Sequence, residues 1–217
     1  MIKAFIFDLD GTLVDTLGDI ASIMNGFLRS KGWPEHPLGS YRTMVGRGFS
    51  NLLRSALPPE ASGDMERLYR EAYDLYEAAG SGDSRPYPGA VEALESLAAS
   101  GAPLAIVSNK PETIARNMMD DLFPGVRFAL VRGGRAGQPI KPDPTGAFEA
   151  GAACGAAPRE CAFVGDSDVD MRTAQAAGML PVGAAWGFRG EAELRDAGAV
   201  VIAASMADIP PLLGSSF

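Results

Sequence analysis

The chain has 217 residues, of which 47% are hydrophobic and 21% charged, and its formal net charge is −8. This composition is typical of a globular protein and excludes a membrane span, and the acidic balance without a Lys/Arg run argues against a nucleic-acid partner. The length exceeds one typical domain but falls short of two, so we expect a main domain that carries a smaller insertion. The N-terminus lacks the features of a signal peptide, and we expect a cytoplasmic protein.

The first predicted strand, Phe5–Leu9, runs into a loop that holds two carboxylates one residue apart, Asp8 and Asp10. Alternate residues of an extended strand point the same way, so both acids should face one site. Two acids are costly to bury unless a cation or a reacting group accompanies them. This loop is therefore the first candidate for an active site.

After Asp15 the pattern changes from strand to helix. Apolar residues recur at three- and four-residue spacing, which predicts three amphipathic helices. Their apolar positions are, in chain order, Ile20, Ile23, Met24, Phe27 and Leu28; Leu52, Leu53, Ala56 and Leu57; and Met65, Leu68, Tyr69, Ala72, Leu75 and Tyr76. We expect no strand here, and we assign residues 16–82 to a helical cap inserted into a core made of residues 1–15 and 83–217.

From Tyr87 onward the chain alternates helix and strand. The apolar segments predict strands at 104–107, 128–131, 161–164, 180–184 and 199–202, and helices at 91–98, 114–122, 143–153 and 169–177. The strands are apolar throughout, as expected when helices cover both faces of a sheet. The sequence therefore predicts an α/β fold with a doubly wound, parallel, Rossmann-like sheet.

Polar residues follow three of these strands, at the edge where doubly wound sheets bind ligands. The strand-end residues are Asp8 and Asp10 after the first strand; Ser108, Asn109 and Lys110 after Val107; and Asp166, Ser167, Asp168 and Asp170 after Val164. Lys141 is expected to begin the helix that precedes the last of these strands. Each motif alone could be a turn, a helix cap or a solvated lysine, but their joint arrival at strand ends indicates function.

The acids predict a metal site. Asp8, Asp10 and Asp166 should converge, and two like charges 4 Å apart repel by about 4 kcal/mol at an effective dielectric near 20. Such a cluster requires a divalent cation, and its oxygen ligands favour Mg²⁺ over Zn²⁺, which prefers His or Cys. The only histidine, His36, is expected to be a surface residue of the insertion.

A metal and one lysine suit phosphoryl transfer. Mg²⁺ and Lys141 would offset charge on the transferring group, while Ser108 and backbone N–H groups near Gly11 and Asn109 hold its oxygens. One carboxylate would attack phosphorus and form an aspartyl-phosphate that water then hydrolyses. The other would protonate the leaving oxygen and afterwards deprotonate that water.

Four segments of the chain resemble the signature of the haloacid dehalogenase superfamily. They are Phe7–Thr16, Val107–Asn109, Lys141–Pro142 and Gly165–Asp170. The resemblance implies these roles: nucleophile, Asp8; general acid/base, Asp10; phosphate binding, Ser108 and Lys141; substrate contact, Gly11, Thr12 and Asn109; Mg²⁺ ligands, Asp8, the backbone carbonyl of Asp10, and Asp166. Asp170 would orient Lys141 or a metal-bound water.

The branch of the superfamily is indicated by further residues. Asp10 favours phosphoryl transfer, since true dehalogenases lack the second acid of the first motif. The segments Val45–Gly48 and Trp186–Phe188 resemble phosphoglycolate phosphatases, which makes 2-phosphoglycolate the favoured substrate. By this resemblance Arg47 would grip the substrate carboxylate with a bidentate fork, the structural alternative being a pair with an acid on a helix.

Other functions stay open. β-Phosphoglucomutase relatives share the first motif and the cap type, although their usual histidine is absent from residues 17–24, and a pyrophosphatase is a third enzyme possibility. A phospho-accepting, receiver-like module also combines strand-end acids with a lysine, but the roughly 70-residue insertion and Asp10 argue against it. We expect a small phosphorylated metabolite as partner, no nucleic acid and no membrane, and a monomer or homodimer.

Overall fold

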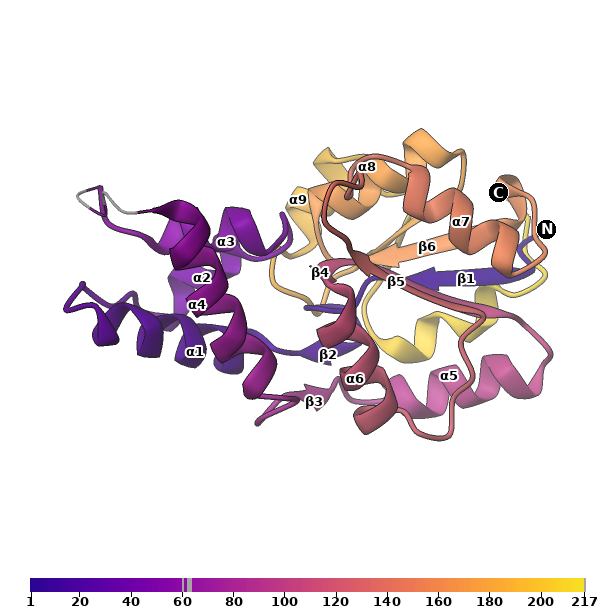
Figure 1. Cartoon of the computed structure of the whole chain (residues 1–217). Helices are drawn as coiled ribbons and strands as arrows, with labels where there is room; N and C mark the ends of the chain where they lie inside the picture. Colours follow the sequence, from indigo (N-terminus) through magenta and orange to yellow (C-terminus); the bar gives the residue numbers. More distant parts are fainter. Residues whose placement is uncertain (60, 62–63, 217) are drawn as a thin grey trace.

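The computed structural model describes residues 1–59, 61 and 64–216, and its centre is a six-stranded sheet (Figure 1). The strands are β1 (Ala4–Phe7), β4 (Leu104–Pro111), β5 (Leu130–Gly134), β6 (Cys161–Gly165), β7 (Leu180–Ala184) and β8 (Val201–Ala203). Their order is β5-β4-β1-β6-β7-β8, and every neighbouring pair is parallel. This topology confirms the predicted α/β fold class.

Helices cover both faces of the sheet. They are α5 (Ala90–Ala99), α6 (Glu112–Leu122), α7 (Thr145–Ala153), α8 (Asp168–Ala177) and α9 (Glu191–Asp196), with 3₁₀ turns at Pro158–Glu160, Met206–Asp208 and Pro210–Leu212. Alternate residues of β1 serve the two faces: Phe5 and Phe7 pack with α5 and α6, whereas Ala4 and Ile6 pack with α7 and α8. Because both faces are buried, the strand is apolar throughout.

Four further helices form a cap beyond the carboxyl ends of β1 and β6 (Figure 1). They are α1 (Leu17–Ser30), α2 (Leu38–Met44), α3 (Phe49–Ala56) and α4 (Met65–Ala78). They share a hydrophobic cluster of their own, with Phe27, Tyr41 and Leu53 at its centre. Helices α1, α3 and α4 match the predicted periodicity, but α2 was not predicted because Tyr41 is its only buried residue.

A two-stranded antiparallel ladder joins the cap to the rest of the chain. It pairs β2 (Val14–Asp15), where the chain enters the cap, with β3 (Arg85–Pro86), where it returns. Strands of two residues are too short to show a period, so the sequence did not reveal them. No strand occurs among the described residues between 16 and 82, in line with the expectation from sequence.

Two features near the carboxyl edge of the sheet differ from the sequence expectation. Strand β4 continues past Val107 to Pro111, with a register shift between these two residues. Ser108 to Lys110 therefore lie within the last part of the strand and not after it. Lys141 does not begin a helix: α7 starts at Thr145. Prolines at 142 and 144 disfavour the helical conformation of the residues that precede them, which delays the helix.

The described helices contain none that is long and apolar enough to cross a membrane. The two ends of the chain lie side by side at the edge of the sheet farthest from the cap (Figure 1), where the Ile2 N–H donates to the Ser215 carbonyl over 2.9 Å.

Candidate active site

Three aspartates meet where β1 and β6 end. These strands are adjacent and parallel, with Phe7 opposite Val164, so the loops that follow them meet. Asp8 follows β1, Asp166 follows β6, and Asp170 lies in the first turn of α8; one oxygen from each lies within 4.8 Å of the others. All three side chains are buried. We call these residues the acid cluster.

Lys141 supplies a positive charge inside the acid cluster. Its Nζ lies 2.7 Å from Asp8 Oδ1 and 2.6 Å from Asp170 Oδ1. The contact with Asp170 is a hydrogen bond, whereas Asp8 Oδ1 has no aligned donor among the described residues despite the short separation. A buried carboxylate oxygen without a donor marks a position for a cation or a ligand.

The electrostatics of the acid cluster agree with an excess of negative charge. Burial, reinforced by Asp170 and opposed by Lys141, raises the pKa of Asp8 to about 7. Burial together with Asp170 and Asp8 raises the pKa of Asp166 well above its ordinary value. Burial alone would lower the pKa of Lys141, but the attraction of Asp170 and Asp8 raises it overall.

The acid cluster fits a divalent metal ion. Three carboxylates face one ammonium, so a cation is needed to offset the remaining charge. The donors are carboxylate oxygens, and such hard ligands suit Mg²⁺, Ca²⁺ or Mn²⁺ better than Zn²⁺. Asp10, which the sequence predicted to bind through its backbone carbonyl, contributes no side-chain oxygen to the cluster.

Asp166 is held by close packing. The Phe188 N–H donates to its Oδ2 over 2.7 Å, and the Thr12 hydroxyl lies 3.4 Å from its Oδ1. Gly11 has φ +84°, and a Cβ there would come within 2.4 Å of Asp166 Oδ2; a Cβ on Gly187 would come within 2.2 Å of the Asp166 Cβ. Thus Gly11 and Thr12, predicted as substrate contacts, lie against Asp166.

Asp170 is the most enclosed member of the acid cluster, with no exposed surface. Its Oδ2 accepts hydrogen bonds from the Ser167 hydroxyl at 2.6 Å and the Ser167 N–H at 3.1 Å, which caps α8. Its Oδ1 remains for Lys141. Asp170 therefore contacts Lys141 directly; the resemblance implied that it orients Lys141 or a metal-bound water, and this role stays a prediction.

Asp10 is not a member of the acid cluster but lines a cavity together with Asp8. Its Oδ1 accepts hydrogen bonds from the Thr16 hydroxyl at 2.8 Å and from Lys110 Nζ at 2.9 Å. The Lys110 side chain is 1% exposed, donates to the Tyr76 hydroxyl and lies 4.7 Å from the centre of the Tyr76 ring. Lys110 and Tyr76 had no predicted role. The place of Lys110 at the end of an apolar strand could have indicated a functional residue, because lysines are rarely buried without a partner.

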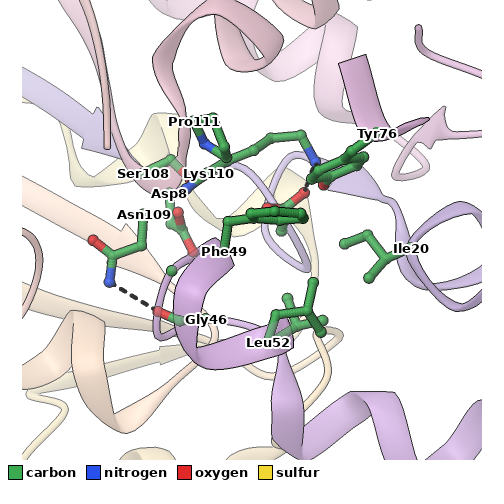
Figure 2. Close-up of a pocket in the computed structure, with 13 residues that line it drawn as sticks. Asp8, Ile20, Gly46, Phe49, Leu52, Tyr76, Ser108, Asn109, Lys110 and Pro111 are labelled. Atoms are coloured by element: carbon green, nitrogen blue, oxygen red, sulfur yellow. Dashed lines mark hydrogen bonds and ion pairs between the residues drawn. The ribbon is translucent and has the colours of Figure 1, made fainter. Parts of the chain in front are cut away.

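Asn109 links three segments of the chain. Its Nδ2 donates to the carbonyl of Gly46 at 2.9 Å (Figure 2). It also donates to the carbonyl of Lys141 at 2.9 Å, and its Oδ1 accepts from the Lys141 N–H at 2.8 Å. These contacts occupy the side-chain amide, so the backbone is the part of Asn109 left for substrate. The neighbouring Ser108 hydroxyl is buried beside Asp8 and accepts from the Lys110 N–H at 3.2 Å.

Arg47 pairs with an acid rather than lining the cavity. Its Nη2 lies 3.1 Å and 3.0 Å from the two oxygens of Asp168, the first residue of α8, and 47% of its side chain is exposed. Arg172 also reaches Asp168, at 3.4 Å. The structure therefore agrees with the alternative given for Arg47, a pair with an acid on a helix, and Arg47 does not contact the acid cluster.

A small cavity lies between the acid cluster and the cap (Figure 2). It measures about 30 Å³, and Asp8, Asp10, Ser108, Asn109 and Lys110 form its polar side. The remaining lining residues come mainly from the cap: Ile20, Val45, Gly46, Gly48, Phe49, Leu52 and Tyr76, together with Pro111. A ligand in this cavity meets reactive carboxylates on one side and an apolar wall on the other.

Comparisons with known proteins agree with this site. The family model for haloacid dehalogenase-like hydrolases matches residues 2–178, which include all four signature segments. A phosphoglycolate phosphatase of Xylella fastidiosa (strain Temecula1) is 33% identical over 187 residues, which cover 86% of this chain and 82% of the relative. One from Pseudomonas syringae pv. tomato is 35% identical and covers 86% and 70%, respectively. The crystal structure of a predicted phosphoglycolate phosphatase from Haemophilus somnus 129PT superposes with a TM-score of 0.86 at 28% identity, over 97% of each chain.

Proposed function

The chain belongs to the haloacid dehalogenase-like hydrolases, and from that premise we propose that it is a Mg²⁺-dependent phosphatase whose favoured substrate is 2-phosphoglycolate. The convergence of Asp8, Asp166, Asp170 and Lys141 at one edge of the sheet is the observation that carries this proposal. Relatives named phosphoglycolate phosphatase, at 33% to 35% identity, support the choice of substrate.

The acid cluster and its neighbours divide the chemistry among them. Asp8, the Asp10 carbonyl and Asp166 would hold Mg²⁺, which when bound would offset the charge of the phosphoryl oxygens. Asp8 attacks phosphorus, and the bond between phosphorus and the ester oxygen breaks as the aspartyl-phosphate forms. Asp10 gives its proton to the departing alcohol, so the two acids have separate tasks.

The second half of the reaction uses the same residues. Asp10, now ionised, takes a proton from water, and the water oxygen bonds to phosphorus as the bond to Asp8 breaks. The products are orthophosphate, the free alcohol and the restored Asp8. Lys141 and Ser108 hold the phosphoryl oxygens throughout, and Asp170 keeps Lys141 in place through the 2.6 Å contact.

The proposed division into domains follows the hydrophobic cluster of the four cap helices, against which Ile114 and Phe188 of the core pack. Residues 16–82 form the cap and residues 1–15 and 83–217 the core, joined by the β2–β3 ladder. Closure of the cap over the acid cluster would exclude water other than the attacking molecule. The partner is a small phosphorylated metabolite, as the relatives named phosphoglycolate phosphatase indicate, and the cavity of about 30 Å³ must widen by cap opening to admit it.

A substrate panel tests the proposed function. With Mg²⁺ present, we expect orthophosphate release from 2-phosphoglycolate to exceed that from pyrophosphate, sugar phosphates and p-nitrophenyl phosphate. Phosphate release distinguishes a phosphatase from a phosphomutase, which returns an isomeric sugar phosphate. Undiminished activity after exhaustive dialysis against EDTA would contradict the metal-dependent mechanism.

A further inference from the structure

The active-site cavity contains one positive charge that the reaction above does not use. Among the described residues that line it, Lys110 is the one cationic side chain. Lys141 lies 2.7 Å from Asp8 Oδ1, is assigned above to the phosphoryl oxygens, and is not among the residues that line the cavity. The rest of the wall facing Lys110 is largely apolar, with Ile20, Phe49 and Leu52 among its members. A buried cation in such a wall is suited to an anionic ligand group.

Lys110 is held firmly and comes from the core rather than the cap. It extends from the end of β4 toward Tyr76 (Figure 2), whose hydroxyl accepts a hydrogen bond from Nζ. Burial alone would lower the pKa of Lys110, but Asp10 and Tyr76 raise it above its ordinary value, so the ammonium is charged at neutral pH. Its position is fixed relative to Asp10 by the 2.9 Å contact.

Lys110 lies beside the place where the leaving group of the reaction is expected. A general acid must approach the ester oxygen to about 3 Å, so the alcohol part of the substrate lies beside Asp10. Lys110 Nζ lies 2.9 Å from the Asp10 carboxylate and therefore beside the same alcohol. In the phosphoester of a 2-hydroxy acid, a single carbon separates the ester oxygen from the carboxylate. A carboxylate at that spacing is within reach of the Lys110 ammonium.

We propose that Lys110 determines specificity by binding the carboxylate of a small phosphorylated 2-hydroxy acid, an inference that rests on the proposed phosphatase function. Arg47, the other candidate for this task, is half exposed and does not line this cavity, although it lines a larger one that shares Gly48 and Asn109 with it. The apolar wall disfavours hydroxyl-rich sugar phosphates, because their hydroxyls would be buried there without partners.

The test compares two esters that differ only at the group facing Lys110. In 2-hydroxyethyl phosphate a hydroxymethyl group replaces the carboxylate of 2-phosphoglycolate. With Mg²⁺ and the full chain, we expect Lys110→Met to lower kcat/KM for 2-phosphoglycolate about 100-fold more than for 2-hydroxyethyl phosphate. A loss of kcat/KM that is the same for both esters reflects a displaced Asp10. A change in the ratio of the two kcat/KM values reflects the lost contact with the substrate carboxylate.

Arg47→Met is the matched variant, since it removes the competing cation. We expect it to change the ratio of the two kcat/KM values by less than about threefold. Equal losses for both esters in Lys110→Met would overturn the inference, and so would a selective loss of 2-phosphoglycolate hydrolysis in Arg47→Met.

A measurement on the unaltered protein keeps the inference testable if Lys110→Met does not fold. Glycolate should inhibit hydrolysis of 2-hydroxyethyl phosphate with an inhibition constant at least about tenfold lower than that of ethylene glycol. Equal inhibition by the two alcohols would overturn the inference.

Failure of the proposed function gives a different result. A chain that hydrolyses neither ester nor p-nitrophenyl phosphate with Mg²⁺ is not a phosphatase, and the role of Lys110 fails with it. A chain that hydrolyses both esters with a ratio unaffected by Lys110→Met remains a phosphatase, and only the role of Lys110 is overturned.

Discussion

The acid cluster and the loop by which the cap reaches it are built in opposite ways. Asp8, Asp166 and Asp170 are buried, and their contacts with Lys141 and with backbone N–H groups are 2.6 to 3.1 Å long. The end of α2 and the loop after it meet the core through the half-exposed Arg47, which pairs with Asp168, and through three backbone carbonyls. Two of these accept from Arg189, at 3.1 and 3.2 Å, and the third, of Gly46, accepts from Asn109 at 2.9 Å.

The acid cluster and the cap loop therefore differ in how firmly their contacts hold them. Buried charges are costly to leave unpaired, so the acid cluster has one arrangement that satisfies it. Exposed ion pairs contribute little, about 0 to 1 kcal/mol, so the Arg47–Asp168 pair adds little to the hold of the cap on the core. The buried Lys110–Tyr76 contact is the stronger link between them. Four experiments test this comparison.

The largest effect is expected at Asp8. Asp8→Asn removes the nucleophile and should lower kcat by at least about 10⁴-fold, with no phosphoenzyme detected by mass spectrometry. Asp10→Asn should still form the phosphoenzyme slowly, because its loss affects proton transfer and not the attack on phosphorus. Equal and mild losses in the two variants would contradict the assigned roles.

The next effect concerns the metal. Asp166→Asn keeps an acceptor for the Phe188 N–H but removes a negative charge from the acid cluster, so the half-saturating Mg²⁺ concentration for activity should rise about 100-fold. The matched control is Asp168→Asn, two residues away, which breaks the contact with Arg47 and should change that concentration less than about threefold. Similar shifts in both variants would contradict a metal site limited to the acid cluster.

A pH effect should separate the buried acids from the exposed ones. The pKa of Asp8 rises from 3.8 to about 7 on folding, so the folded chain binds more protons than the unfolded chain between these values. Stability of the metal-free protein should therefore fall as pH rises through this window.

With EDTA present, we expect the Tm of the unaltered chain to fall by several degrees between pH 5 and pH 7.5, since a chain of this size loses about 2–4 °C per kcal/mol. Asp8→Asn cannot titrate at this position and should show a smaller fall. Parallel Tm curves for the two proteins, recorded by scanning calorimetry, would exclude Asp8 as the source.

The smallest effect is expected on the cap side. Arg47→Ala breaks the half-exposed pair with Asp168 and should lower the free energy of unfolding by less than about 1 kcal/mol, measured by urea denaturation. Arg29→Ala, which breaks an exposed pair with Glu35 within the cap, is the control and should have a similar effect. A loss of several kcal/mol in Arg47→Ala alone would show that the cap is locked to the core.

Much of this molecule was predictable because its signals are local. Short, continuous apolar runs in the strands and three- or four-residue spacing in α1, α3 and α4 identify the elements without knowledge of their partners. The rule that ligands bind at the carboxyl ends of parallel strands then brings Asp8 and Asp166 to one edge. The short elements α2, β2 and β3 were not predicted, because so few residues show no measurable period of apolar positions.

Only the tertiary structure shows which cationic side chain pairs with which carboxylate. The segment around Lys141 indicated its place in the site, but nothing near Lys110 or Arg47 in the sequence indicates which acid each one pairs with. Lys110 contacts Asp10, 100 residues away, and also the Tyr76 hydroxyl of the cap, and Arg47 contacts Asp168, 121 residues away. Local sequence dictates backbone conformation through short-range sterics and burial, whereas the pairing of side chains depends on how distant segments pack, which no spacing along the chain encodes.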